Sequence, residues 1–177
     1  MNRHFVYPKP LGVKKASVEV FAPQIAEALQ FKPGDDIIAL VARLGGKVVS
    51  GSTGNEDIES GSMIARSISD FTIYLSPLTS LERDRFTVAH ELGHLLLHLP
   101  KVIEDNPSAV MRATRHVDNQ DATQQRAEWE ANWFAASFLM PDQLFRDSYN
   151  RGISFMQQKF KVSRAAIEAR AKSLKLV

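Results

Sequence analysis

Histidine and glutamate side chains with metal-binding spacing lie in the stretch RFTVAHELGHLLLHLP, residues 85–100. His90 and His94 are four residues apart, so on a helix both imidazoles project from one face and can bind the same metal ion. Glu91 is rotated by about 100° from His90, which places it beside the metal rather than on it. There its carboxylate can take a proton from a water molecule that the metal activates. This HExxH pattern therefore predicts a metal site with a catalytic base.

A third histidine continues the same stripe. His98 is two turns from His90, too far to bind the same ion, so we expect a surface histidine or one that supports a ligand. Catalytic zinc commonly has three protein ligands and a water, so the third ligand must come from elsewhere in the chain. The alternative is an amphipathic helix with incidental histidines. The position of the pattern in mid-helix, between a capping signal and Pro100, favours a metal site.

The second informative stretch is the expected helix at 123–140, which is apolar on all sides near its end. Glu128 and Asn132 are four residues apart on one face, whereas Glu130 points about 200° away from Glu128. A buried Asn132 needs a hydrogen-bond partner, and a ligand histidine needs its second ring nitrogen held. We therefore assign Glu128 as the third ligand and Asn132 as the group that holds a ligand histidine. Glu130 is the alternative ligand, and two solvated glutamates remain the non-functional alternative.

The elements that must position these two helices follow from apolar periodicity and turn residues. We expect helices at 17–31 and 37–45, strands at 47–51, 62–67 and 70–76, and tail helices at 142–150, 154–160 and 163–174. The histidine helix should begin with Thr79 as its cap and stop at Pro100. The strand at 70–76 is either an edge that holds an extended substrate or an internal strand.

Composition excludes several classes of protein. The 177 residues are enough for one domain with a proper core, and 44% hydrophobic with 24% charged residues is typical of a globular protein. A net charge of +2 gives no electrostatic case for binding nucleic acid or a membrane surface. The absence of cysteine excludes disulfides and thiolate metal sites. No apolar run is long enough to span a membrane and the start lacks a signal peptide, so we expect a cytoplasmic protein.

Two segments together carry a resemblance to a known family. RFTVAHELGHLLLH, followed some thirty residues later by EWEANWFAASFLMP, resembles the ImmA/IrrE family of bacterial zinc metallopeptidases over roughly residues 17–175. The family pattern implies His90, His94 and Glu128 as metal ligands, Glu91 as the catalytic base and Asn132 as the polar position that follows. It implies one Zn²⁺ per chain, although such ligands also accommodate Mn²⁺ or Fe²⁺.

The resemblance also implies a fold. We expect an α+β, zincin-like metallopeptidase domain, in which a small, mostly antiparallel sheet packs against the active-site helix and the second ligand-bearing helix. We divide the chain into an extended N-terminal arm (1–16), the metallopeptidase domain (17–150) and a C-terminal helical extension packed on it (151–177).

The function implied is that of a zinc-dependent endopeptidase. Its expected substrate is a helix-turn-helix transcriptional repressor, in stress-response, mobile-element or toxin–antitoxin-type regulation. The alternative is a metal-binding regulatory module that inactivates a repressor by binding it, without proteolysis. His116, in a long polar stretch, is a candidate second oxyanion donor. The basic tail is expected to pack through Ile167 and Leu174, so we expect no direct binding of nucleic acid.

Overall fold

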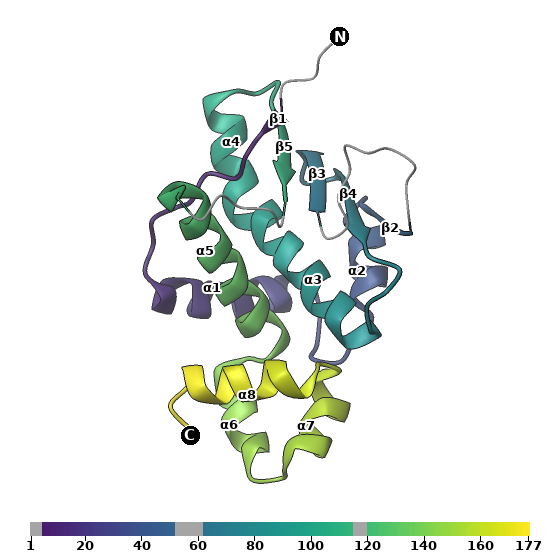
Figure 1. Ribbon diagram of the computed structural model, residues 1–177, viewed down its shortest axis with the longest axis vertical. Coiled ribbons are helices and arrows are strands. Elements are labelled where there is room, and N and C mark those ends of the chain that lie inside the picture. Colours follow the sequence, from purple (N-terminus) through teal and green to yellow (C-terminus); the bar gives the residue numbers. More distant parts are fainter. Residues whose placement is uncertain (1–4, 52–61, 115–119) are drawn as a thin grey trace.

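The computed structural model describes residues 5–51, 62–114 and 120–177, which form an α+β fold (Figure 1). Its described strands make a five-stranded mixed sheet in the order β1-β5-β3-β4-β2. The strands are β1 (Phe5–Val6), β2 (Lys47–Ser50), β3 (Ser62–Ser67), β4 (Asp70–Leu75) and β5 (Val110–Ala113). The α+β class and the three predicted strands are therefore confirmed.

The strand directions differ from the expectation. β3 is antiparallel to β4 and β5, but the two outer pairs, β1 with β5 and β2 with β4, are parallel. A mostly antiparallel sheet is therefore wrong, because β1 comes from the N-terminal segment and β2 pairs with β4 rather than with its successor in the chain. β4 lies between β3 and β2, so of the two alternatives for this strand the internal one is confirmed and the edge one is wrong.

The helices of the described chain cover this sheet and extend beyond it. They are α1 (Lys15–Ala28), α2 (Ile37–Arg43), α3 (Leu81–Gly93), α4 (Leu99–Asp105), α5 (Ala122–Leu139), α6 (Asp142–Tyr149), α7 (Ile153–Phe160) and α8 (Arg164–Ser173). Each predicted helix is present, because periodicity and caps are local signals; Asp36, for example, accepts hydrogen bonds from the first amides of α2. α5 packs against both α1 and α3, which brings the two predicted site helices together (Figure 1).

The histidine helix departs from the expectation at both ends. Ser80, not Thr79, is its cap, and the Ser80 hydroxyl accepts a hydrogen bond from the Arg83 amide at 3.3 Å. The helix also does not stop at Pro100 but passes through a π-helical turn, η1 (His94–His98), into α4. In this turn the Leu99 amide bonds to the His94 carbonyl, five residues back. Pro100 therefore falls in the first turn of α4, where its missing N–H costs nothing.

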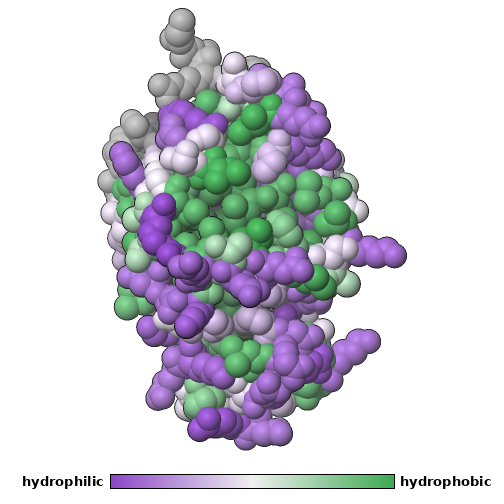
Figure 2. Space-filling view, turned by 180° about the vertical axis from the view of Figure 1, so that it is seen from behind, coloured by the Kyte–Doolittle hydropathy of each residue, from purple (hydrophilic) through white to green (hydrophobic). Residues whose placement is uncertain are grey.

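The C-terminal helices form one end of the molecule, and the sheet lies towards the other (Figure 1). α6, α7 and α8 gather at the end away from the sheet (Figure 1). Seen from behind, hydrophobic side chains form a broad area above the level of these helices, bordered by hydrophilic side chains (Figure 2). Ile167 and Leu174 of the tail are buried, as expected. The division of the chain at residue 150 stays a prediction, and within the described ranges no helix is long and apolar enough to cross a bilayer.

Candidate metal centre

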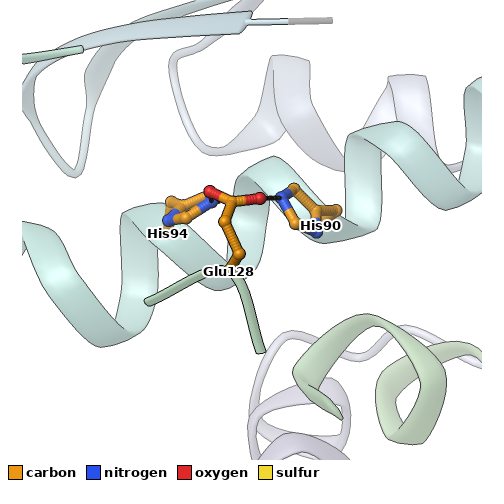
Figure 3. Close-up of side chains that lie close together, drawn as sticks. All are labelled: His90, His94 and Glu128. Atoms are coloured by element: carbon orange, nitrogen blue, oxygen red, sulfur yellow. Dashed lines mark hydrogen bonds and ion pairs between the residues drawn. The ribbon is translucent and has the colours of Figure 1, made fainter. Parts of the chain in front are cut away.

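Three predicted ligands meet where α3 crosses α5. The Glu128 carboxylate spans the two imidazoles, with Oε2 3.1 Å from His90 Nε2 and Oε1 3.0 Å from His94 Nε2 (Figure 3). The two Nε2 atoms are themselves 3.1 Å apart. The predicted face of α3 and the predicted face of α5 are thus brought together at one point.

Gly93 permits this meeting of helices. A Cβ atom at Gly93 would lie 3.1 Å from the Ala131 Cα and 3.2 Å from the Ala131 carbonyl oxygen. Those distances are tighter than ordinary van der Waals contact. Glycine therefore lets the α5 backbone approach α3 between the histidines and Glu128.

The hydrogen bond to His90 determines which of its nitrogens is free. His90 Nδ1 lies 3.0 Å from Asn132 Oδ1, an acceptor, so Nδ1 carries the proton and Nε2 keeps its lone pair. Asn132 is placed where it was expected relative to His90, but it is exposed rather than buried. Its side chain reaches the histidine from the wall of a surface cavity.

A second chain of contacts holds His94. His94 Nδ1 lies 3.0 Å from His98 Nδ1, and His98 Nε2 lies 3.1 Å from Glu130 Oε2. An ionised Glu130 only accepts, so His98 donates to it from Nε2 and, as a neutral ring, accepts at Nδ1. His94 consequently donates from Nδ1 and leaves Nε2 bare. His98 is fully buried, so it is a supporting histidine and not a surface one.

These residues fit a divalent metal ion. Two neutral imidazoles and one carboxylate form a common ligand set of catalytic zinc. Ligands at 2.0–2.1 Å from a tetrahedral ion are about 3.3 Å from one another, close to the 3.0–3.1 Å observed between these donor atoms. His90, His94 and Glu128 can therefore hold one metal ion with little rearrangement.

Electrostatics favours an ionised Glu128. Burial opposes its ionisation, but the His90 and His94 rings beside its two oxygens outweigh burial and lower the pKa of Glu128 below its ordinary value. For His94, burial dominates and lowers its pKa to about 3. For His90, burial acts in the same direction, but the neighbouring Glu128 and Glu91 carboxylates prevail and raise its pKa, so that a proton competes with a metal ion for Nε2.

The other predicted residues lie as follows. Glu91 is buried on α3 next to His90. The structure does not bring Glu130 into the ligand group; its carboxylate, which is fully buried, contacts His98 and the amides of Leu11 and Gly12 instead. The pairing of Glu130 with His98 was missed; its one sequence signal was that His98 continues the helix face of the two ligand histidines. His116 lies outside the described residues.

A cavity of about 890 Å³ shares Asn132 with the metal site, although none of the three ligands lines it. Asn132, which bonds to His90, lines it, together with Trp133 from α5 and Arg83 from α3. Lys15 and Arg170 line it as well, and Arg170 is almost fully buried. The cavity is therefore a partly basic, partly aromatic hollow that lies next to the site on the far side of Asn132 from His90.

The family model of the peptidase M78 family, described as the IrrE N-terminal-like domain, matches residues 42–172. That range is well over half of the chain. The chain belongs to this family. Membership in the M78 family implies a metallopeptidase, and the predicted family is therefore confirmed. No curated protein matches the chain.

A solved structure supports the fold of this M78 domain. The chain is similar to a Mycobacterium tuberculosis transcriptional regulator, with a TM-score of 0.59 and 14% sequence identity. The similarity covers 89% of this chain and 46% of that regulator, so the chain spans less than half of the regulator's length. At this identity the likeness concerns the fold alone.

Proposed function

We propose that this M78-family chain is a zinc-dependent endopeptidase with a zincin-like fold. The observation that carries the proposal is the convergence of the Nε2 atoms of His90 and His94 on the Glu128 carboxylate, with Glu91 adjacent to His90 on the same helix. Such a site serves hydrolysis because it combines metal ligands with a nearby proton acceptor.

Each residue has a distinct role in this proposal. His90, His94 and Glu128 hold the zinc ion, which supplies a Lewis acid that polarises the scissile carbonyl and acidifies water. Glu91 accepts the proton of the attacking water and returns it to the leaving amine. Asn132 keeps the proton of His90 on Nδ1, so that the lone pair of Nε2 faces the metal site.

The proposed substrate is a protein, specifically a helix-turn-helix repressor in the cytoplasm, as the family resemblance suggests. The cavity lined by Asn132 supports binding of a polypeptide segment near the site, since its volume of about 890 Å³ is enough for several side chains. Its basic groups include Lys15 and Arg83, while its acid, Glu19, is paired with Arg170 at 2.7 Å. A segment with an acidic side chain would complement this surface.

The test compares two glutamine variants on the same helix. Purified helix-turn-helix regulators from the same genome are incubated with the zinc-loaded protein, and fragments are identified by mass spectrometry. Glu91→Gln should keep zinc and lower the cleavage rate by about 100-fold or more. Glu82→Gln, the same change at an exposed position of α3, should cleave at the normal rate. If Glu91→Gln inactivates a regulator as fast as wild type, the protein acts by binding and the peptidase proposal is wrong.

A further inference from the structure

Residues 9–13 of the predicted N-terminal arm (1–16) are held against α4 and against α5, which carries Glu128. Lys101 Nζ donates to the Pro10 carbonyl at 2.9 Å, and Arg126 donates to the Val13 carbonyl. The arm precedes the part of the chain that the family model matches. Family membership therefore assigns it no role.

The arm and the metal centre share one buried carboxylate. Glu130 accepts hydrogen bonds from the amides of Leu11 and Gly12, both at 2.8 Å, and from Arg126 Nε at 3.2 Å. Its remaining contact is His98 Nε2, at 3.1 Å. Because Glu130 is 0% exposed, these donors take the place of the water that a carboxylate otherwise needs.

We propose that His98 and Glu130 are positioning residues that keep His94 in its ligand tautomer, and that docking of the arm on Glu130 thereby raises the affinity of the site for zinc. This inference rests on the metal site of the proposed function but not on its peptidase activity. His94 keeps its proton on Nδ1 only while His98 accepts it there, and His98 accepts there only while Glu130 takes its Nε2 proton.

Displacement of the arm breaks this sequence of contacts. Glu130 then loses two of the four donors described for it, and its carboxylate turns towards the water that takes the place of the arm. As Glu130 moves away from His98, the proton of His98 is free to shift to Nδ1, and His94 loses its acceptor. The Nε2–H form of His94, which cannot bind a metal, then gains population. By linkage, zinc must strengthen arm docking by the same factor as the arm strengthens zinc binding.

The positioning role is tested with His98→Phe and Glu130→Gln in the full chain. Zinc affinity is measured by competition with a chromogenic chelator, and the tautomer of His94 in the metal-free protein by ¹⁵N NMR of its ring. Both variants should bind zinc about 10- to 100-fold more weakly and show a larger Nε2–H fraction at His94. Wild-type affinity and an unchanged tautomer in the folded variants would overturn the role.

The coupling to the arm is tested with a matched pair of glycines. Gly12 (φ +72°) and Gly152 (φ +86°) both have positive φ, and a Cβ at either meets no atom within 4 Å. Gly12→Ala should therefore strain only the arm, and Gly152→Ala only the α6–α7 connection. Gly12→Ala should speed amide exchange at residues 11 and 12 and weaken zinc binding about fivefold or more, while Gly152→Ala leaves the affinity unchanged.

Two results would overturn the coupling. One is equal zinc affinity of Gly12→Ala and Gly152→Ala; the other is zinc that leaves the amide exchange of the wild-type arm unchanged. Gly12→Ala leaves the side chains of Glu130, His98 and His94 unchanged. The proposal can therefore still be tested with this variant if His98→Phe or Glu130→Gln does not fold. Because these measurements involve no peptide hydrolysis, loss of the coupling and loss of the peptidase function are distinguished.

Discussion

Gly93 should control both the stability of the fold and the geometry of the metal centre. It lies in α3 between the two ligand histidines and faces Ala131 of α5. An alanine Cβ would meet the Ala131 backbone at 3.1 and 3.2 Å and the Phe134 Cβ at 3.2 Å. None of these atoms is the end of a flexible side chain, and α5 is supported from its other side by α1. The helices must therefore part by a few tenths of an ångström.

The expected loss of stability in Gly93→Ala follows from two opposing effects. Overpacking a well-packed contact costs about 1–3 kcal/mol, whereas alanine in place of glycine inside a helix returns about 1 kcal/mol. Gly93→Ala should therefore reduce the free energy of unfolding by about 1 kcal/mol, which lowers Tm by about 2–4 °C. Valine carries two methyl groups more than alanine and is a weaker helix former. Gly93→Val should therefore reduce the free energy of unfolding by about 3 kcal/mol.

Urea denaturation of the metal-free protein measures the change in the free energy of unfolding, and competition with a chelator measures zinc affinity. Parting α3 from α5 moves His90 and His94 away from Glu128, so affinity should fall from wild type to alanine to valine. A stabilised Gly93→Ala protein, together with wild-type zinc affinity in Gly93→Val, would refute the reasoning. Only the helix-propensity effect would then be present.

Three further outcomes are expected. Glu128→Ala should lose stoichiometric zinc in elemental analysis, whereas Glu82→Ala should retain it, because Glu82 is exposed and away from the ligand group. Arg83→Glu should raise KM for the protein substrate without changing zinc affinity in chelator competition, because Arg83 lines the cavity but contacts no ligand. The pKa of Glu130 is lowered from 4.5 to about 2, since hydrogen bonds from His98 and the arm outweigh burial. Its contribution to stability is therefore complete above pH 4.5 and is lost as pH falls towards 2, so the difference in unfolding free energy between wild type and Glu130→Gln should shrink across that window in urea titrations.

Local features of the chain were predictable because their causes are local. The helical repeat of 3.6 residues places His90 and His94 on one face whatever surrounds them. Likewise the alternation in β4 places Phe71, Ile73 and Leu75 on one side of the sheet, and all three are buried. The predictions for α2, α5 and the tail helices depended on the same kind of short-range pattern.

Other features depend on segments that are distant in sequence. The parallel pairing of β1 with β5 joins residues more than a hundred positions apart, and no short pattern encodes it. Pro100 was expected to end a helix, but a π-helical turn shifted the hydrogen-bond register so that the proline caused no break. Asn132 was expected to be buried from its apolar neighbours, but the cavity at its position leaves it exposed.

The metal centre contains both kinds of feature, those set by local sequence and those set by packing. The sequence by itself determined that two imidazoles on one helix face should share an ion, and it favoured Glu128 over Glu130 as their partner. Only the tertiary structure decided that Glu128 reaches both Nε2 atoms, and that Glu130 instead joins His98 to the N-terminal arm. The physical reason is that spacing fixes directions within one helix, whereas distances between helices depend on packing, here the contact of Gly93 with Ala131.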